Sequence, residues 1–355
     1  MQTIKGKQEK NVSGRFRKRV GEGMLLLMLC CLLSTNTYGQ DPQFSQYYAA
    51  PLLIAPSFAG NSLGSRAFFN FRDQWAKLPG AFVTYSVAVD NNFYALNSGF
   101  GIAAMRDVAG SAGYGTSSIT AMYSYRFNVN DDWRVRPGIG MSYAQRGMNN
   151  SKAVFGDQIS ITGPDARSIE PPQPNYNYMD AVASVVVYDR LMWFGLSVEH
   201  LMRPNASIDG LDSRLPMTWL QFGGINIPRE NRVGKATEIV TLNYLLRLSK
   251  IYRQLDIGLN WYHAPLLMGF AWRGYPLDMD TFDALIFTVG IAFNNIALGY
   301  SYDFTVSKLG PATGGSHEIT LSIGFNEGGK NLRRGAIPCP DVVKYRMFGD
   351  KESFR

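Results

Sequence analysis

Histidine, the side chain most often used for acid–base chemistry near neutral pH, occurs only three times, as His200, His263 and His317. A hydrolase would need such a histidine together with a nucleophile and an Asp or Asn partner. His317 and Glu318 are neighbours, and neighbours on one strand point to opposite faces. No group of residues has zinc-ligand spacing, so we expect neither a metal nor a cofactor. The sequence therefore predicts a protein that is not an enzyme.

Two further patterns fall short of binding motifs. Gly99-Phe-Gly101 and Gly138-Ile-Gly140 lack the remainder of a phosphate-binding loop, so strand bends or close packing explain them better. Asp131 and Asp132 lie in a short turn without the frame of an EF-hand. The function must therefore be sought in the architecture rather than in a catalytic motif.

The segment 296–325 shows that architecture most clearly. In its second half Ile319, Leu321, Ile323 and Phe325 alternate with Glu318, Thr320, Ser322 and Gly324. Alternation with a period of two predicts a strand with one apolar and one polar face. The segment 296–303 repeats the pattern, and the glycines and proline of 305–315 indicate a surface loop between the two strands. A soluble β-sandwich would show the same alternation, so the interpretation depends on how often it recurs.

Alternating segments of about ten residues recur throughout 66–325. We count fourteen, with twelve or sixteen as alternatives: 66–75, 81–90, 98–107, 116–127, 134–146, 178–188, 193–203, 217–228, 237–248, 253–263, 266–274, 283–293, 296–303 and 316–325. This length suits a tilted strand that crosses hydrocarbon. Since no later segment has the run of about 18 apolar residues that a membrane helix needs, a closed barrel is the remaining way to satisfy the backbone in lipid. We predict an all-β fold: a transmembrane antiparallel β-barrel of about 14 strands, forming a single domain.

Loop lengths and tryptophans agree with a barrel. Short connections such as 189–191 alternate with long ones such as 147–177, which is typical of barrels whose two termini are periplasmic. All six tryptophans fall near segment ends, where rings lie at the lipid headgroups; core tryptophans are the alternative. They are Trp75, Trp133, Trp193, Trp219, Trp261 and Trp272.

The first 39 residues have the features of a cleavable export signal. Basic residues fill 1–19, the ten-residue apolar run Met24–Leu33 follows, and Thr37 and Gly39 supply small residues at positions −3 and −1. An uncleaved amphipathic anchor is the alternative. The chain has 35 basic and 28 acidic residues, and removing 1–39 leaves 28 against 26, so the basic charge gives no support to nucleic-acid binding.

Two segments flank the predicted barrel. In 40–65 the prolines exclude a regular strand or helix, and apolar residues suggest an extended segment that either plugs the lumen or lies along the periplasmic rim. Its candidate plug residues are Phe44, Tyr47, Tyr48, Pro51 and Pro56. The tail 326–355 is expected to be periplasmic, either as a docking peptide or as a flexible, solvated end. Its candidate partner-binding residues are Arg333, Arg334, Cys339, Tyr345 and Phe348.

Cysteine usage excludes an internal disulfide in the mature chain. Cys30 and Cys31 lie in the export signal, so only Cys339 remains, either to pair with another chain or as a small tail residue.

Three blocks resemble the PorP/SprF family of type IX secretion membrane proteins. The first is Asp41-Pro-Gln-Phe-Ser-Gln-Tyr-Tyr-Ala-Ala-Pro51 with Ala55-Pro-Ser-Phe-Ala-Gly60, although the family commonly has Asn where Ala55 stands. The second is Trp272-Arg-Gly-Tyr-Pro276 with Phe282-Asp-Ala-Leu285. The third is Gly299-Tyr-Ser-Tyr-Asp303, Ser307-Lys-Leu309 and Gly314-Gly-Ser-His-Glu-Ile319. The resemblance extends over residues 41–325.

This resemblance implies an outer-membrane component of the type IX secretion or gliding machinery. Such a component would anchor periplasmic ring or lipoprotein subunits, or receive a secreted adhesin at the cell surface. Lipid and secretion-system proteins are then its expected partners. A general diffusion porin is the alternative function, and an outer-membrane lipase or protease is a third.

Overall fold

The computed structural model describes residues 41–62, 64–80, 82–154, 158, 174–207, 212–230, 236–275, 282–293, 295–307 and 310–325. Everything discussed below lies in one compact unit, Pro42–Arg355. Its long strands are β1 (Ser65–Gln74), β2 (Phe82–Phe93), β3 (Ser98–Ala109), β4 (Tyr114–Tyr125), β6 (Arg134–Gly147), β7 (Tyr176–Tyr188), β8 (Met192–Glu199), β9 (Thr218–Glu230), β10 (Ala236–Ser249), β11 (Arg253–His263), β12 (Leu266–Gly274), β13 (Ala284–Phe293), β14 (Ile296–Thr305) and β15 (Ser316–Phe325). The two-residue β5 (Phe127–Asn128) continues β4.

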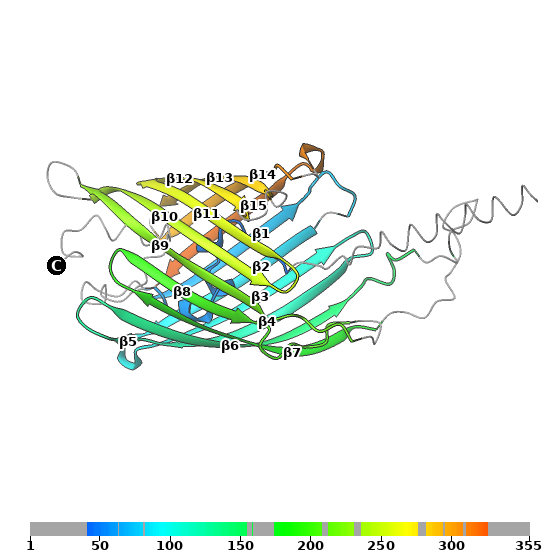
Figure 1. Ribbon diagram of the computed structural model, residues 1–355, viewed down its shortest axis with the longest axis horizontal. Coiled ribbons are helices and arrows are strands. Elements are labelled where there is room, and N and C mark those ends of the chain that lie inside the picture. Colours follow the sequence, from blue (N-terminus) through cyan, green and yellow to red (C-terminus); the bar gives the residue numbers. More distant parts are fainter. Residues whose placement is uncertain are drawn as a thin grey trace, which may run out of the picture. The chain divides into compact units, whose positions relative to one another are not determined.

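The strands form one closed antiparallel barrel (Figure 1). Each long strand pairs with its neighbours in sequence, β4 also pairs with β6, and β1 pairs with β15 from Ser65↔Phe325 to Gln74↔Ser316. Closure removes the unpaired sheet edges, so the backbone groups of the wall are satisfied within the sheet. The prediction of a transmembrane antiparallel barrel of about fourteen strands is confirmed.

The barrel wall has an apolar outside and an inside with many polar side chains. In β1, Phe69 is 42% exposed, whereas Asn70 and Arg72, which point inward, are 5% and 3% exposed. The outer face carries large apolar side chains on strand after strand, among them Val87, Ile102, Ile119, Ile139, Leu259, Phe287, Val289, Leu298 and Ile319. This is the predicted alternation, and it matches a wall that lipid surrounds.

The two ends of the barrel differ in their connections. At the end where β1 begins and β15 ends, the connections are 94–97, 126–133, 189–191, 231–235, 264–265 and 294–295; we call it the short-turn mouth. At the opposite end the connections are 75–81, 110–113, 148–175, 200–217, 250–252, 275–283 and 306–315; we call it the long-loop mouth. The expected length pattern is not followed everywhere: 250–252 and 110–113 are short for the long-loop mouth, and 126–133, which includes β5, is long for the short-turn mouth.

Three local expectations were wrong. The segment 116–127 is interrupted at Arg126, between β4 and β5. Strand β8 ends at Glu199, earlier than expected, because His200 adopts a left-handed backbone conformation with a φ of 57°. Trp193 does not face lipid: it is buried in the interior cluster, because it occupies an inward position of β8.

Helical structure among the described residues is limited to single turns. They are the 3-10 turns η1 (Tyr47–Ala49), η2 (Pro51–Leu53), η3 (Pro56–Phe58), η4 (Tyr94–Leu96) and η7 (Pro311–Thr313). None of the helices in this described part has the length and apolar character needed to cross a membrane.

Candidate functional site in the barrel lumen

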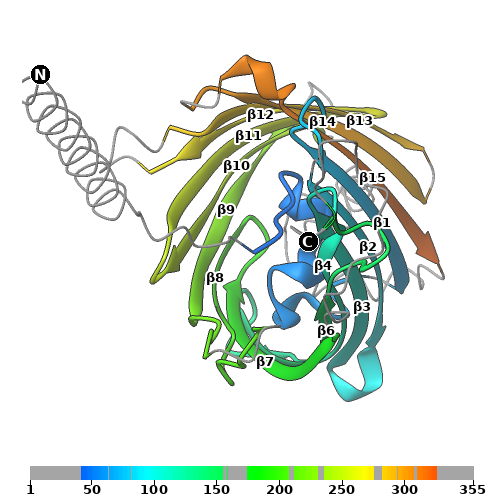
Figure 2. The ribbon, with the colours of Figure 1, turned by 90° about the vertical axis from the view of Figure 1, so that its right-hand side faces the viewer.

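The segment before β1 lies inside the ring of strands. We call residues 42–62 the lumen segment; Figure 2 shows it in blue within the barrel. It is not extended, as the sequence suggested, but folds into η1, η2 and η3. Pro51 and Pro56 stand at the first positions of η2 and η3, where the fixed φ of proline suits a helical turn and its missing N–H costs no hydrogen bond.

The candidate plug residues are all buried in this arrangement. Phe44, Tyr47 and Tyr48 are 4%, 9% and 5% exposed, and Pro51 and Pro56 are buried as well. The Tyr47 hydroxyl donates a hydrogen bond to the side-chain oxygen of Asn243 on β10. The lumen segment therefore makes both apolar and polar contacts with the inner wall.

Apolar packing holds the middle of the lumen segment. Leu52, Ile54 and Phe58 are each less than 10% exposed and belong to one buried cluster with residues of the wall. The ring of Phe58 packs against that of Phe222 on β9, with 5.2 Å between centroids. Burial of an apolar side chain of this size contributes about 1.5–3 kcal/mol, so the middle of the segment is held by an apolar core that it shares with the inner wall.

Ser45 is the polar centre of the segment's first part. Its hydroxyl donates to Asp303 at 2.6 Å and accepts from Arg72 at 2.7 Å and from Arg273 at 3.1 Å. One donor and two acceptor positions are all that a hydroxyl group offers. Every hydrogen-bonding position of this side chain is therefore used.

The next contact engages the backbone. The amides of Ser45 and Gln46 donate to the two carboxylate oxygens of Glu318, at 2.7 and 2.9 Å. The Gln46 side chain donates to Ser301 at 3.3 Å and accepts from Thr320 at 3.0 Å. Because the carboxylate is charged and fully buried, these bonds are of the stronger, charge-assisted kind.

These contacts join a buried chain of alternating charges, which we call the lumen ion network. Arg273 bridges Asp256 and Asp303 at 3.1 Å each, and Arg72 bridges Asp303 at 2.8 Å and Glu318 at 3.1 Å. Arg247 lies 3.7 Å from Asp256 and donates to Gln43 at 2.6 Å. The network runs across β10, β11, β12, β14, β1 and β15, as Arg247, Asp256, Arg273, Asp303, Arg72 and Glu318. Its three positive and three negative charges balance.

The last part of the lumen segment is bonded near the other mouth. The Ser57 amide donates to Ser184 at 2.8 Å, and the Ala59 carbonyl accepts from Ser124 at 2.8 Å. The Ser62 carbonyl accepts from Asn92 and from the Tyr94 hydroxyl, each at 3.0 Å. Burial raises the pKa of Tyr94 to about 12, so its hydroxyl keeps the proton that it donates.

The lumen segment thus crosses the barrel from one mouth to the other. Ser45 and Gln46 bond to Asp303 and Glu318, which lie near the long-loop ends of β14 and β15. Ser62 bonds to residues at the short-turn mouth, where β1 begins three residues later. The described chain therefore enters at the long-loop mouth and reaches the wall at the short-turn mouth.

Two glycines of the wall allow the segment to come close. A methyl group on Gly99 would overlap the carbonyl of Ala59 and lie 2.8 Å from the Cα of Gly60. One on Gly138 would overlap the backbone amide of Ser57. The paired glycines of the sequence are therefore explained in part by close packing, as expected.

Gly99→Ala is expected to push the lumen segment off the wall, because the obstructing atoms are backbone and cannot rotate away. The matched control is Gly101→Ala on the same strand, whose methyl would meet Leu52 and Ala59 side-chain carbons at 3.4 Å, an ordinary contact. Limited proteolysis of the folded barrel should cleave residues 42–62 faster in the first variant only. Equal protection of both variants would contradict the close approach.

The other sequence candidates are distributed as follows. Arg333, Arg334, Cys339, Tyr345 and Phe348 lie outside the described residues. The histidines do not come together: His200 pairs with Asp180 at 2.5 Å, His263 lies 3.6 Å from Glu238, and His317 bonds to Tyr300 at 2.8 Å. Among the residues that the structure describes, no group of three or more His, Cys, Asp or Glu could hold a metal ion.

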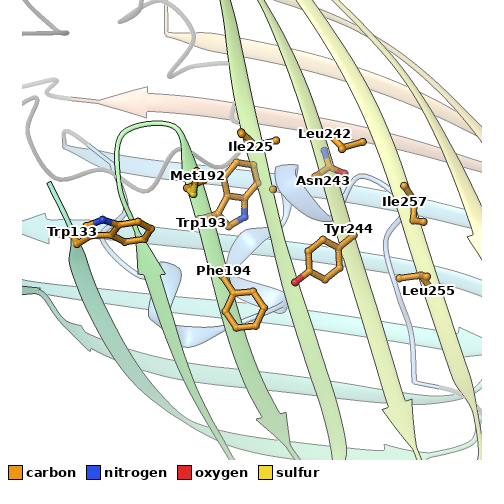
Figure 3. Close-up of a pocket in the computed structure, with 11 residues that line it drawn as sticks. Trp133, Met192, Trp193, Phe194, Ile225, Leu242, Asn243, Tyr244, Leu255 and Ile257 are labelled. Carbon is orange, nitrogen blue, oxygen red and sulfur yellow. The ribbon is translucent and has the colours of Figure 1, made fainter.

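The wall also has an apolar hollow of about 590 Å³ over β8 to β11 (Figure 3). It is lined by Trp133, Met192, Trp193, Phe194, Gly224, Ile225, Leu242, Asn243, Tyr244, Leu255 and Ile257. Phe194, Leu242 and Ile257 are among its outward-facing residues. The hollow is therefore bordered by outward-facing apolar side chains, with the inward-facing Trp193 and Asn243 also in its lining.

Sequence reasoning missed the lumen ion network. The alternation places Arg72 and Glu318 on the inner face, and this was the available signal. The partners of each charge depend on the register of β1 with β15 and on strands far apart in sequence. The blocks around Ser45, Arg273, Asp303 and Glu318, separated by up to 273 residues, meet at this one place.

Comparisons with known proteins agree with these blocks. The model of a family described as "Type IX secretion system membrane protein PorP/SprF" matches residues 36–323. No curated protein matches the chain significantly. Among solved structures, it is similar to the toluene transporter TodX of P. putida (9% identity, 77% of this chain and 94% of that chain covered, TM-score 0.43). It is also similar to a Pseudomonas aeruginosa FadL homologue (11% identity, 73% and 89% covered, TM-score 0.40). Likenesses at this level carry no functional argument.

Proposed function

Because the chain belongs to the PorP/SprF family of type IX secretion system membrane proteins, we propose that it serves that machinery as a sealed, non-enzymatic barrel of the outer membrane. The family and the barrel fold are of non-enzymatic kinds, and both fit an outer-membrane location. The sealed state and the role of the barrel as a scaffold are the proposal.

The observation that carries the proposal is the lumen segment. A fourteen-strand barrel is wider than the eight-strand barrels that side chains alone can fill, so an empty one would leave room for an aqueous path. Here residues 42–62 occupy that room and make polar contacts near both mouths. A barrel with such a filling is better suited to hold partners than to conduct solutes.

Anchoring of periplasmic secretion-system subunits is the role we favour within this proposal. The barrel's short turns and the end of β15 share one mouth, which by the usual asymmetry of such barrels faces the periplasm. The chain continues from there into 326–355, which contains Arg333, Arg334, Cys339, Tyr345 and Phe348. Basic and aromatic residues are common among those that dominate protein interfaces.

Deleting residues 326–355 is expected to remove the periplasmic ring or lipoprotein subunits from material purified through this barrel. The deletion begins after Phe325, the last residue of β15, so the register of β15 with β1 is kept. The measurement is affinity purification from solubilised membranes, with the full chain as reference. A Tyr345→Ala/Phe348→Ala variant tests the aromatic anchors separately, and Cys339→Ser tests a covalent link on non-reducing gels.

If the same subunits co-purify without residues 326–355, anchoring through this tail is wrong. Co-purification of a secreted adhesin instead, independent of the tail, would favour the cargo role. A steady flux of small solutes through the full chain would favour the diffusion porin.

A further inference from the structure

Two buried arginines face each other near the short-turn mouth. The register of β5 and β4 against β6 pairs Phe127 with Val135 and Ser124 with Gly138, which sets Arg126 opposite Arg136. Arg126 is 8% exposed and Arg136 is fully buried. Like charges directly opposite each other on neighbouring strands destabilise a sheet. The positive charges of Arg126 and Arg136 therefore need negatively charged or hydrogen-bond-accepting partners.

Within the described residues, the two guanidinium groups have too few hydrogen-bond acceptors. Arg126 Nη2 donates to the Asn97 side-chain oxygen at 2.8 Å, and Arg136 Nη1 donates to the Ala59 carbonyl at 3.2 Å. Both acceptors are uncharged. The remaining buried nitrogens, Nε and Nη1 of Arg126 and Nε and Nη2 of Arg136, have no hydrogen-bond partner in the described part of the chain.

The neighbouring carboxylate is already engaged. Asp90 on β2 accepts two hydrogen bonds from Arg66, at 3.1 and 2.9 Å, and forms a buried ion pair with it. Arg66, Arg126 and Arg136 thus share one carboxylate, whereas the lumen ion network balances three arginines with three acids. A buried charge without a partner is costly. Among these four residues the excess is two positive charges.

We propose that Arg126 and Arg136 bind a phosphate group, either as free phosphate or as a phosphomonoester. A phosphate monoester carries a charge of about −1.5 to −2 at pH 7, which matches the excess, whereas one carboxylate would leave a positive charge. Each guanidinium presents a planar fork of donors that fits phosphate oxygens. The four unpartnered N–H-bearing nitrogens supply the donors.

The pair lies near the short-turn mouth. Arg126 lies beneath Tyr94 and Asn97, which are only half-buried, and its guanidinium carbon is 5.8 Å from the centre of the Tyr94 ring. On the lumen side, the Ala59 carbonyl accepts the hydrogen bond from Arg136. A phosphate oxygen carries a negative charge that the Ala59 carbonyl lacks, and it attracts the guanidinium more strongly, so the phosphate displaces this carbonyl and loosens the end of the lumen segment.

The test uses the full chain in detergent micelles, in buffers free of phosphate and at constant ionic strength made up with chloride. Inorganic phosphate should raise the unfolding temperature of the parent protein in a saturable way. Arg136→Gln and Arg126→Gln should each weaken phosphate binding by about tenfold or more. In phosphate-free buffer these variants should be at least as stable as the parent, because each removes an uncompensated charge.

The matched control is Arg134→Gln, two residues away on β6, whose guanidinium already donates to the carbonyl of Asp132 at 3.0 Å. It should keep the parent's response to phosphate. A second readout is hydrogen exchange of the Ala59 and Asn61 amides, which phosphate should accelerate because their turn is displaced.

The source of the phosphate is distinguished by probe. Glycerol 3-phosphate reports a soluble phosphomonoester, and phosphatidic acid added to the micelles reports a lipid-borne one, with phosphatidylcholine as the neutral reference. Binding of phosphatidic acid but of neither soluble probe would support a lipid-borne group. If no probe changes the unfolding temperature, water alone supplies the missing hydrogen-bond acceptors of Arg126 and Arg136. That result would overturn the proposal. So would an equal response of the Arg134 and Arg136 variants.

Discussion

Arg273→Met is expected to destabilise the folded barrel by about 3–5 kcal/mol, the usual cost of removing one partner from a buried ion pair. Arg273 bridges Asp256 and Asp303 and also donates to Ser45. All the charges involved are no more than 2% exposed, so water cannot take the place of the lost guanidinium. The loss would also loosen the lumen segment at the long-loop mouth.

The measurement is urea unfolding in lipid vesicles, followed by tryptophan fluorescence. Arg214→Met is the control, because Arg214 pairs with Asp212 at 3.1 Å while both side chains remain mostly exposed, and such pairs contribute little. The double variant Arg273→Met/Asp256→Asn should lose less than the sum of the two single losses, because the groups interact. Equal stability of Arg273→Met and the parent would contradict the network's role.

Removing residues 42–62 is expected to convert a non-conducting barrel into one with steady ionic current. The lumen segment packs its buried aromatic and aliphatic side chains against an apolar part of the inner wall, and much of the remaining inner wall is polar. A polar lumen of this strand number would fill with water. Planar-bilayer recording of the purified protein provides the measurement.

A point variant tests the same idea in case the barrel without residues 42–62 does not fold. Ser45→Asp places a carboxylate beside Asp303 and Glu318, which should release the first part of the segment and produce intermittent openings. Ser57→Ala is the matched control: its buried hydroxyl has no hydrogen-bond partner in the described chain, and its amide still bonds to Ser184. A steady current through the parent, or a correctly folded deletion that stays closed, would refute the sealing role.

The strands could be predicted from the sequence because each one carries its own signal. The alternation in β1, β2 and β15 needs only the knowledge that neighbouring residues point to opposite faces. The turns between strands were visible for the same local reason. The fourteen-strand wall was therefore accessible without a structure, apart from interruptions such as Arg126 and the early end of β8.

The site could not be predicted in the same way, because its contacts join positions that no local pattern relates. Ser45 meets Asp303 and Arg273 only once the barrel has closed with the segment inside. Trp193 was misjudged although a local signal existed: it shares the inward face with Gly195 and Ser197, whereas Phe194 and Leu196 face outward. The extended form expected for 40–65 ignored that proline is well suited to the first position of a helical turn.

The direction in which residues 42–62 traverse the barrel gives the molecule a mechanical polarity. The segment is tethered to the wall through Gly64 and Ser65, so traction from that side would break the bonds of Ser62 and Ala59 first and those of Ser45 last. A pull on the opposite end would first load the bonds of Ser45 and Gln46 to the lumen ion network. The order in which the contacts break therefore depends on the side from which the segment is pulled.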